Sequence, residues 1–370
     1  MMNILVLPLF QMPSGHHQVA DAIMYSLQHR FPNVSCEKLD FLSYCNEQVE
    51  RRVADFYLRW ISLSPHSYEW MYRRWMKKFE QPAMEPWLLY FEKKMKRLLQ
   101  EKKPDLVICT HSFPSHVLQR LKQRGAITVP VINVYTDFFL SGIWGKTAID
   151  YHFVPHKDAK RLLCTMFHVE PRRVIVTGIP IHEQIVPVQK RKRRKNKRIL
   201  VAGGNQGLGK IEQFLMNATH TQLTYDVLCG KNETLYHEIK SWNNPRIRPY
   251  RYISDPAKMN ELYDKVDAIV TKPGGVTMSE VLAKRLPAFT LSYLPGQEQM
   301  NLHYLRKKGL IYFLNDNEPY DQQLMRVLTD NDEMDQLGKR IEQYWLEREK
   351  TAQEALSEWI EARLHAVKKR

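Results

Sequence analysis

Cysteine is scarce in this sequence, and the few that occur are scattered. Five are present among 370 residues, and their spacing forms neither the close pairs that bind zinc nor a regular disulfide framework. The sequence therefore excludes a small disulfide-stapled domain and a zinc module. Isolated thiols of this kind fit a reducing cytoplasm. The positions are Cys36, Cys45, Cys109, Cys164 and Cys229.

Long hydrophobic runs are also lacking. No apolar run approaches the ~18 residues that a membrane-spanning helix needs. Residues 1–10 are apolar, but they lack a basic leader and a small-residue cleavage site, so we predict a first buried strand there and no signal peptide. Hydrophobic residues still make up 44% of the chain. This length and composition predict two domains, each with its own core.

Acidic residues are outnumbered by basic ones, 40 against 55, which gives a net charge of +15. Such a charge requires an anionic partner, and nucleic acid, anionic lipid and a nucleotide-sugar all qualify. The most basic stretch, residues 190–198 (KRKRRKNKR), predicts a solvated linker because like charges repel. It holds no aromatic residues to stack on bases. We therefore expect attraction to an anionic membrane surface ahead of nucleic-acid binding.

Strand-like apolar segments alternate with polar or helical segments along the chain. The pattern begins with a strand over residues 3–9, a helix over 17–27 and a strand over 34–39, and it resumes over 199–313. Further strands are predicted over residues 105–110, 129–135, 151–154 and 173–177. This alternation is typical of an α/β fold with doubly wound parallel sheets. Two such sheets, with loops at the carboxyl ends of their strands, would form a ligand cleft.

The most informative motif is TKPGGVTMSE, residues 271–280. The apolar run before it, residues 267–271, predicts a strand, and the apolar spacing within and after it predicts a helix. Gly274 and Gly275 would then lie where the strand turns into the helix, and free N–H groups with the helix dipole favour a phosphate there. Glu280 follows about one helical turn later, where its carboxylate could accept hydrogen bonds from ribose hydroxyls. The motif predicts a nucleotide site.

A strand–glycine–helix turn also occurs in α/β proteins that bind no phosphate, so the motif alone leaves a purely structural turn open. A second segment favours the nucleotide site. Pro295 and Gly296 mark a turn, and Gln297, Glu298 and Asn301 follow it as a polar cluster. Polar groups gathered in this way suit the hydroxyls of a sugar.

The series TKPGG, SE, LP, PGQE and N between residues 271 and 301 resembles the donor-binding half of the processive diacylglycerol glycosyltransferases and the monogalactosyldiacylglycerol synthases. These are relatives of the cell-wall enzyme that transfers N-acetylglucosamine onto lipid-linked muramyl-pentapeptide. The similarity covers most of the chain, and residues 45–100 match in character alone. It extends to RILVAGGNQGLG (198–209), YDVLCGKN (225–232), SGH (14–16), TD (136–137) and TGIP (177–180).

The resemblance implies the GT-B fold: α/β, with two doubly wound Rossmann-like domains facing a cleft and a C-terminal helix packing back on the first domain. We predict an N-terminal acceptor- and membrane-binding domain over residues 1–185 and a basic linker over 186–198. A nucleotide-sugar donor domain would follow over 199–335, and a crossover helix over 336–370 would complete the chain.

The resemblance also assigns the chemistry. His16, in the family's glycine–histidine motif, would be the base that deprotonates the acceptor. Asp137 would orient or assist it, contact the acceptor, or simply cap a strand end, while His17 and His111 have weaker support. On the donor side, the diphosphate would be held by Gly203, Gly204 and Asn205, the uracil by Arg251, Tyr252 and Ile253, the phosphates by Gly274, Gly275 and Thr277, the ribose by Glu280, and the transferred sugar by Gln297, Glu298 and Asn301.

Neither a metal nor another cofactor is expected, because the helix dipole and basic residues could stabilise the departing phosphate. Residues 330–332 spell an Asp-X-Asp sequence, but we predict a helix cap there. The chain departs from the family pattern at Pro13-Ser14, where relatives often carry glycine, and at Asn205-Gln206-Gly207. These departures leave the identity of the acceptor open.

Residues 45–100 form an aromatic and basic insertion. Apolar stripes at helical spacing run over residues 53–61, 68–79 and 88–99, and the second and third lie opposite faces that carry Lys and Arg, such as Arg73, Arg74, Lys77 and Lys78. An aromatic face backed by a basic face suits a helix lying in a membrane interface. The same stripe suits a helix packed in a core. We therefore expect part of this insertion to face the membrane and part to be packed.

The sequence thus predicts a cytoplasmic inverting glycosyltransferase, peripheral on the inner face of the cell membrane. It would move a hexose from a UDP-sugar, with UDP-glucose ahead of UDP-galactose, to a lipid hydroxyl, with diacylglycerol as first choice. One alternative is N-acetylhexosaminyl transfer to a polyprenyl-linked acceptor. Another is a non-catalytic membrane-associated protein that binds a nucleotide-sugar. Nucleic acid is not an expected partner.

Overall fold

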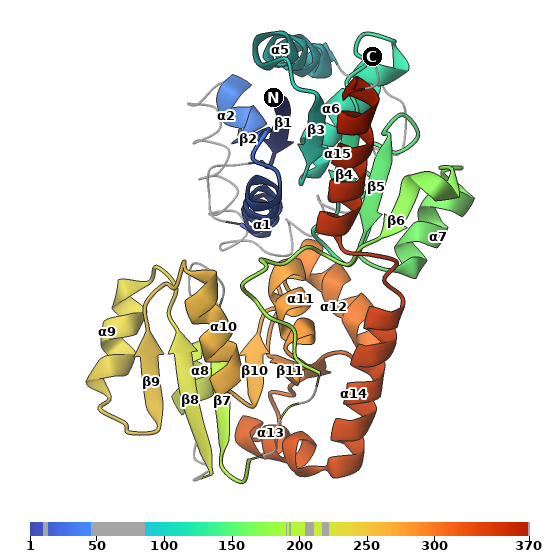
Figure 1. Ribbon diagram of the computed structural model, residues 1–370. Helices are drawn as coiled ribbons and strands as arrows, with labels where there is room; N and C mark the ends of the chain where they lie inside the picture. Colours follow the sequence, from blue (N-terminus) through green and yellow to red (C-terminus); the bar gives the residue numbers. More distant parts are fainter. Residues whose placement is uncertain are drawn as a thin grey trace. The chain divides into compact units, whose positions relative to one another are not determined.

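The computed structural model describes residues 1–9, 14–45, 86–189, 191, 194–203, 211–216 and 222–368 (Figure 1). The chain divides into two compact units. Unit 1 comprises residues 1–182 and 346–370, and unit 2 comprises residues 183–345. Each unit has its own parallel sheet and its own hydrophobic core. The first two predicted aromatic stripes, including Arg73 and Lys77, lie outside the described residues.

Unit 1 is built on a sheet whose described strands all run parallel, in the order β2-β1-β3-β4-β5-β6. The central strands are short apolar runs that are buried along their whole length, as a parallel sheet covered by helices on both faces requires. The strands are β1 (Met2–Leu7), β2 (Val34–Lys38), β3 (Leu106–Cys109), β4 (Val131–Val134), β5 (Tyr151–Val154) and β6 (Val174–Val176).

The helices of unit 1 come from both ends of the chain. The C-terminal helix α15 packs against α1, which confirms the prediction that it returns to the first domain. Just before it, the Glu349 N–H donates to the carbonyl of Val176 at 2.8 Å. The described helices are α1 (Gly15–Arg30), α2 (Phe41–Cys45), α5 (Pro86–Lys102), α6 (Ser112–Gln123), α7 (Lys157–Met166), the 3-10 turn η1 (Pro171–Arg173) and α15 (Ala352–Lys368).

Helix α5 carries the third predicted stripe, and its apolar face is packed in the core of unit 1. Met95, Leu98 and Leu99 belong to that core, while Lys93 and Lys96 are exposed on the other side. For this helix the stripe is therefore core packing with a solvated basic face, one of the two outcomes that the pattern allowed.

Unit 2 repeats the architecture, with described strands in the parallel order β12-β11-β10-β7-β8-β9. Its strands are β7 (Lys197–Ala202), β8 (Leu223–Leu228), β9 (Ile247–Tyr250), β10 (Ala268–Thr271), β11 (Ala288–Thr290) and β12 (Tyr312–Phe313). Its helices are α8 (Ile211–Met216), α9 (Glu233–Ser241), α10 (Pro256–Lys265), α11 (Gly275–Ala283), α12 (Gln297–Lys307), α13 (Tyr320–Thr329) and α14 (Asn331–Leu346).

Each sheet reverses its winding direction at one place. In unit 1 the chain runs from β1 to β2 on one side and then to β3 on the other, and in unit 2 β7 is followed by β8 on one side and β10 on the other. Ligands of doubly wound sheets bind outside the carboxyl ends of the two strands that flank such a switch point. The expected sites are therefore beside β1 and β3 in unit 1 and beside β7 and β10 in unit 2.

The C-terminal tail differs from the single crossover helix that we predicted, because residues 347–351 interrupt it between α14 and α15. The cause is a capping box, in which two residues satisfy each other's backbone N–H groups. The Thr351 N–H donates to Oε2 of Glu354 at 2.7 Å, and the Glu354 N–H donates to Oγ1 of Thr351 at 3.1 Å. A new helix therefore begins at this point.

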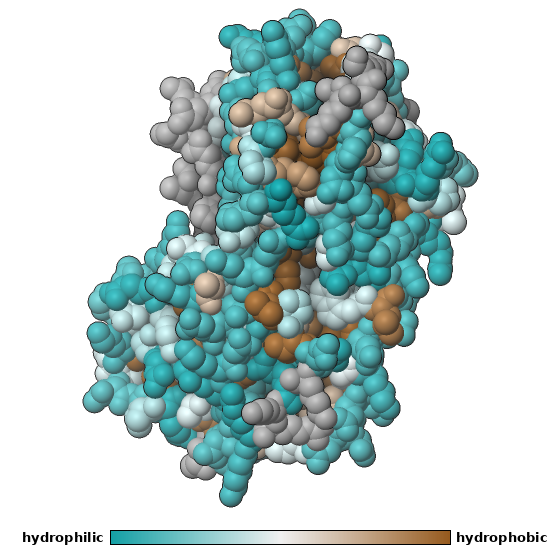
Figure 2. Space-filling model, in the orientation of Figure 1, coloured by the Kyte–Doolittle hydropathy of each residue, from teal (hydrophilic) through white to brown (hydrophobic). Residues whose placement is uncertain are grey.

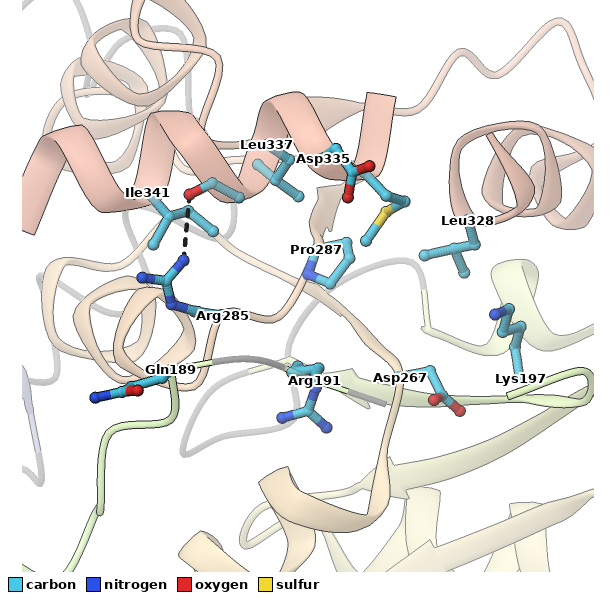
Figure 3. A pocket seen from close by; sticks show the side chains of 12 residues that line it. Gln189, Arg191, Lys197, Asp267, Arg285, Pro287, Leu328, Asp335, Leu337 and Ile341 are labelled. Carbon is cyan, nitrogen blue, oxygen red and sulfur yellow. Dashed lines mark hydrogen bonds between the residues drawn. The ribbon is translucent and has the colours of Figure 1, made fainter. Parts of the chain in front are cut away.

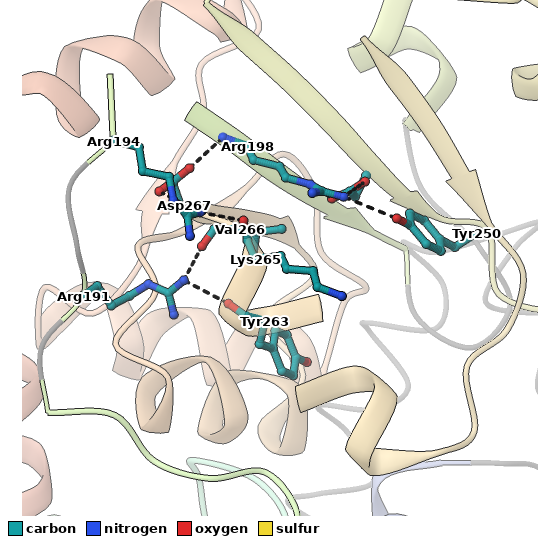
Figure 4. Close-up of polar contacts among 9 residues, drawn as sticks. Arg191, Arg194, Arg198, Tyr250, Tyr263, Lys265, Val266 and Asp267 are labelled. Carbon is teal, nitrogen blue, oxygen red and sulfur yellow. Dashed lines mark hydrogen bonds and ion pairs between the residues drawn. The ribbon is translucent and has the colours of Figure 1, made fainter. Parts of the chain in front are cut away.

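Part of the basic stretch makes contacts that a solvated linker would not make, although Arg194, Lys195 and Asn196 are exposed as such a linker would be. Arg191 and Arg194 donate to backbone carbonyls (Figure 4). Arg198, already part of β7, pairs with the Asp226 carboxylate at 2.9 Å. Most of these carbonyls end α10, where a helix has unsatisfied oxygens and a negative dipole end that attract cations. The carbonyls belong to Tyr263, Lys265, Val266 and, after α11, Lys284.

The face of the molecule drawn in Figure 2 is mostly hydrophilic, and its apolar atoms gather in small patches. Within the described ranges, no helix combines the length and the apolar composition that crossing a bilayer requires.

Candidate functional site

The first candidate site lies at the switch point of unit 1. His16 is the second residue of α1, Thr110 directly follows β3, and Thr136 lies just beyond β4. Nδ1 of His16 lies 2.9 Å from the carbonyl oxygen of Thr110 and 2.9 Å from Oγ1 of Thr136. Three segments far apart in the sequence thus hold one imidazole.

These contacts define the tautomer of His16. A carbonyl oxygen only accepts hydrogen bonds, so Nδ1 must carry the proton that it shares with Thr110. Nε2 is then the unprotonated nitrogen, and it has no partner among the described residues. His111 packs edge-on against this ring at 4.6 Å between centroids, and its own Nδ1 accepts from the Phe113 N–H at the start of α6.

The electrostatic environment keeps His16 neutral. Burial lowers the pKa of His16 below its usual value, while the Asp137 carboxylate and the Thr110 carbonyl partly oppose that lowering. His111 is buried and its pKa is lowered well below the usual value, mainly by desolvation. His16 therefore presents a free lone pair at neutral pH, with a carboxylate close enough to stabilise the imidazolium once a proton arrives.

Two further polar atoms at this place lack partners. Oγ of Ser14, just before α1, and Oγ1 of Thr110 are buried and form no hydrogen bond within the described part of the chain. Buried polar atoms are nearly always paired in native proteins, so orphaned hydroxyls beside His16 indicate a place where a polar ligand makes the missing bonds.

The second candidate site lies at the switch point of unit 2, where β10 leads through Gly274 into α11. Gly274 occupies the N-cap position of α11, and because it has no side chain, no side-chain hydrogen bond caps the helix. A Cβ added at Gly274 would meet no heavy atom within 4 Å. The first intrahelical bond is donated by Met278, so the N–H groups of Gly275, Val276 and Thr277 have no partner within the helix. An uncapped helix start facing open space is a place for an anion.

Glu280 lies on the same helix, and its carboxylate is held by a phenol. The Tyr263 hydroxyl, from α10, donates to Oε2 of Glu280 at 2.8 Å. Burial raises the pKa of Glu280 to about 7, although the Tyr263 hydrogen bond opposes this. A carboxylate with a pKa raised so far would gain from further hydrogen-bond donors such as sugar hydroxyls.

Several other predicted donor residues also follow the carboxyl ends of strands in this sheet. Gly203 follows β7 and is buried, whereas Gly204 and Asn205 lie outside the described residues. Arg251, Tyr252 and Ile253 follow β9. The Arg251 guanidinium lies 4.0 Å from the centre of the Tyr236 ring and its Nε lies 3.0 Å from both Glu233 oxygens, so α9 holds this side chain.

The polar cluster after β11 begins α12. The turn before it needs Gly296, whose φ of 91° is a conformation that other residues rarely adopt. Gln297 is the first helical residue, and Asn301 is buried with 1% exposure. Oε2 of Glu298 accepts from the Leu294 N–H at 2.6 Å, so one carboxylate oxygen already orders the turn.

The Asp-X-Asp sequence is a helix cap, as predicted. Oδ1 of Asp330 accepts from the N–H groups of Asp332 and Glu333, both at 3.0 Å, at the start of α14. In the part of the chain that the structure describes, no group of three or more His, Cys, Asp and Glu side chains is placed to hold a metal ion.

Two residues that position the candidate side chains were not predicted from the sequence. The Thr110 carbonyl fixes the His16 tautomer from 94 residues away, and Tyr263 holds Glu280 from a neighbouring helix. Thr110 ends a predicted strand, which was a usable signal for a ligand-side position. Tyr263 resembles any apolar helix residue, and no local pattern distinguishes it.

Comparison with known proteins shows what the chain is similar to. A family model described as monogalactosyldiacylglycerol (MGDG) synthase matches residues 16–181. An uncharacterized glycosyltransferase of Bacillus subtilis (strain 168), YkoN, is 35% identical over 353 residues, which covers 93% of each chain. The processive diacylglycerol beta-glucosyltransferase of Bacillus cereus (strain G9842) is 30% identical over 348 residues, covering 90% of this chain and 87% of its own.

Solved structures show the same fold at low identity. MurG of Acinetobacter baumannii superposes with a TM-score of 0.60 at 12% identity, covering 98% of this chain and 100% of its own. The glycosyltransferase SnogD of Streptomyces nogalater gives 0.57 at 14% identity, covering 98% and 99%. The predicted GT-B fold class, with two Rossmann-like domains, is confirmed. The motifs, the relatives and the fold together place this chain in the glycosyltransferase family of the processive diacylglycerol glucosyltransferases and the monogalactosyldiacylglycerol synthases.

Proposed function

We propose that this protein is an inverting glucosyltransferase that moves glucose from UDP-glucose to the hydroxyl of diacylglycerol. The observation that carries the proposal is the free Nε2 of His16, the lone pair of a neutral imidazole whose other nitrogen is tied to a backbone carbonyl. A base oriented in this way is what deprotonation of an alcohol requires at neutral pH.

In the proposed reaction, Nε2 of His16 accepts the proton of the acceptor hydroxyl while that oxygen attacks the anomeric carbon of the sugar. The bond from this carbon to the β-phosphate oxygen breaks, and UDP leaves with the electron pair. One displacement of this kind inverts the anomeric centre. Asp137 would stabilise the imidazolium, in keeping with the way its charge raises the His16 pKa.

The donor would be held by unit 2. The unpaired N–H groups of Gly275 and Thr277, behind Gly274, would bind the diphosphate and stabilise the charge that develops on UDP. Glu280 would accept from the ribose hydroxyls. The remaining donor residues follow β7, β9 and β11 at the same edge of the sheet. We propose that the diphosphate is bound by Gly203, Gly204 and Asn205, the uracil by Arg251, Tyr252 and Ile253, and the transferred sugar by Gln297, Glu298 and Asn301.

The choice of glucose and diacylglycerol rests on the names of relatives, above all the diacylglycerol beta-glucosyltransferase of Bacillus cereus. The net charge of +15 supports peripheral attachment to an anionic membrane, which we place at the cytoplasmic face. The departing diphosphate would be stabilised by the α11 dipole and basic side chains without a metal ion.

The direct test is to incubate the purified protein with labelled UDP-glucose, UDP-galactose or UDP-N-acetylglucosamine and with liposomes that contain either diacylglycerol or a polyprenyl-linked acceptor, and then to separate the lipids. We expect a labelled glycolipid from UDP-glucose, formed equally well in the presence of a chelator. Label transferred from UDP-N-acetylglucosamine to a polyprenyl-linked acceptor alone would assign the other enzymatic function. UDP binding without any labelled lipid would identify a non-catalytic protein.

A further inference from the structure

Unit 2 contains a cavity that the proposed glycosyl transfer does not use. Its volume is about 150 Å³, and it is lined on one side by apolar residues of α13 and α14 and on the other by charged residues (Figure 3). The apolar wall includes Leu328, Met334, Leu337 and Ile341, and Pro287 adds to it from the segment before β11.

The cavity lies at the opposite edge of the sheet from the proposed donor site. Lys197 is the first residue of β7, and Asp267 directly precedes β10, so both mark the amino ends of these strands. Gly203 and Gly274 follow the carboxyl ends of the same two strands. A molecule in the cavity would therefore not compete with UDP for the same groups.

Lys197 is the unusual member of the lining. Its side chain rises from β7 into the cavity toward Leu328, and the residue is 8% exposed (Figure 3). Its ammonium group has no hydrogen bond or ion pair in the described part of the chain. Lys197 lines the cavity and its ammonium has no partner there, so an anion bound in the cavity could pair with it.

The other charged groups of the lining are already engaged. Arg191 donates to backbone carbonyls, and Arg285 donates to the carbonyl of Gly338 at 3.3 Å. Oδ2 of Asp267 accepts from the Arg198 N–H at 2.8 Å. Asp335, on α14, adds a second negative charge at the rim. Because two carboxylates share this lining with Lys197, they repel a phosphate dianion more strongly than a monoanion, so we expect a monoanion.

The helix that forms the roof keeps the space open. Gly338 lies in the interior of α14, where glycine destabilises a helix by roughly 0.5–1 kcal/mol relative to alanine. A Cβ added at Gly338 would meet no heavy atom within 4 Å. A cavity of this volume accommodates a molecule of about the size of benzene.

We propose that this cavity is a binding site for a small monocarboxylate with an apolar body, which pairs its carboxylate with Lys197 and packs its body against α13 and α14. The probe is benzoate, compared with benzyl alcohol, which has the same ring without the charge, and with inorganic phosphate, which has charge without the ring.

The experiment measures the thermal midpoint of the full chain with each probe. Benzoate at millimolar concentration should raise Tm by about 2 °C or more in the wild type, while the other two compounds should not. Lys197→Met keeps the aliphatic stem and removes the charge, so it should abolish the benzoate shift. Without ligand, Lys197→Met should melt within about 2 °C of the wild type, because the change removes no hydrogen bond or ion pair among the described residues.

Lys195→Met is the matched control, since Lys195 is an exposed lysine of the same stretch, and it should keep the full benzoate shift. Gly338→Leu should fill the cavity and also abolish the shift. UDP binding should be unchanged in all three variants. An equal shift with benzyl alcohol, a shift with phosphate alone, no shift with any probe, or a benzoate shift that survives Lys197→Met would each overturn the proposal.

Discussion

The imidazole of His16 shows how a backbone carbonyl can select a reactive atom. Thr110 accepts from Nδ1, which leaves Nε2 as the base, and the neighbouring His111 uses its own Nδ1 to cap α6. The two histidines lie in contact, yet each has a defined tautomer and a different task. Their roles follow from the partners of their nitrogens and not from their residue type.

Replacing His16 by Ala should lower kcat by about 10²–10⁴, because general-base catalysis contributes on that order. UDP affinity should stay within about twofold of the wild type, since the proposed donor contacts lie in unit 2. Radiolabel transfer and calorimetry with UDP measure the two quantities. His17→Ala is the matched control. A large loss of kcat in His17→Ala with little loss in His16→Ala would show that His17, and not His16, is the base.

The pH dependence of turnover should follow the same residue. Burial lowers the pKa of His16, so the base is unprotonated at pH 7, and kcat should be flat from pH 7 to 8. It should fall only as the pH drops through a value below the ordinary histidine pKa of about 6.5. A rate that rises between pH 7 and 8 would point to a different base.

The pKa of Glu280 is shifted in the opposite direction to that of His16, since burial raises it from 4.5 to about 7. The folded protein then binds an extra proton between these values, so this group lowers stability as the pH rises through them, by at most about 3 kcal/mol. Glu280→Gln should therefore melt at a higher temperature than the wild type at pH 8 and bind UDP more weakly. A Tm equal to or below that of the wild type at pH 8 would contradict the burial argument.

The helices α11 and α15 differ in how the backbone N–H groups of their first turns are satisfied. The start of α11 has no side-chain cap, in keeping with a bound anion, whereas the start of α15 is closed by the capping box of Thr351 and Glu354. The same orphaned N–H groups are thus satisfied by the chain in one helix and left open in the other. Side-chain caps are also absent at the starts of α1, α12 and α13, so the proposed anion at α11 depends on the open space at Gly274 as well.

Thr351→Ala should destabilise unit 1 by about 1 kcal/mol, the typical value of an N-cap. Glu354→Ala should lose its half of the box, and the double variant should lose less than the sum of the two single changes. Glu361→Ala, at an exposed position of the same helix, is the control and should stay within about 0.5 kcal/mol. Chemical denaturation measures all four, and strictly additive losses would exclude reciprocal capping.

The elements that the sequence predicted well are those defined by local pattern. The strand over residues 151–154 and the turn around Gly274 follow from apolar runs and glycine, and both appear as predicted. The break in the C-terminal tail was missed even though TAQE at residues 351–354 is a capping-box sequence. The arginine contacts to the end of α10 were missed because their partners lie about 70 residues away.

The molecule as a whole carries a net charge of +15, and this charge is the remaining argument for membrane attachment. The protein should cosediment with anionic liposomes, and the bound fraction should fall as salt rises, because screening weakens the attraction. Neutral liposomes at the same salt are the control. Reversing the charges of Arg73, Arg74, Lys77 and Lys78 should reduce binding, and unchanged binding would remove that insertion from the membrane contact.

For the whole molecule, the two-sheet α/β architecture could be predicted because the strand–helix alternation in the sequence is regular. The family could also be predicted, because the glycine and histidine motifs fall after β1 and β10. The strand order could not be deduced, since it depends on pairing between strands that are distant in the chain. That order places His16 and Gly274 at the two switch points, which no local motif reveals.

The most direct measurement is the configuration of the glycosidic bond in the product, determined by NMR on glycolipid made from UDP-glucose and diacylglycerol. The sugar of UDP-glucose is α-linked, so one displacement by a hydroxyl deprotonated at His16 predicts a β-glucoside. The same product should be nearly absent with His16→Ala. An α-glucoside, or a β-glucoside formed at the wild-type rate by His16→Ala, would contradict the account.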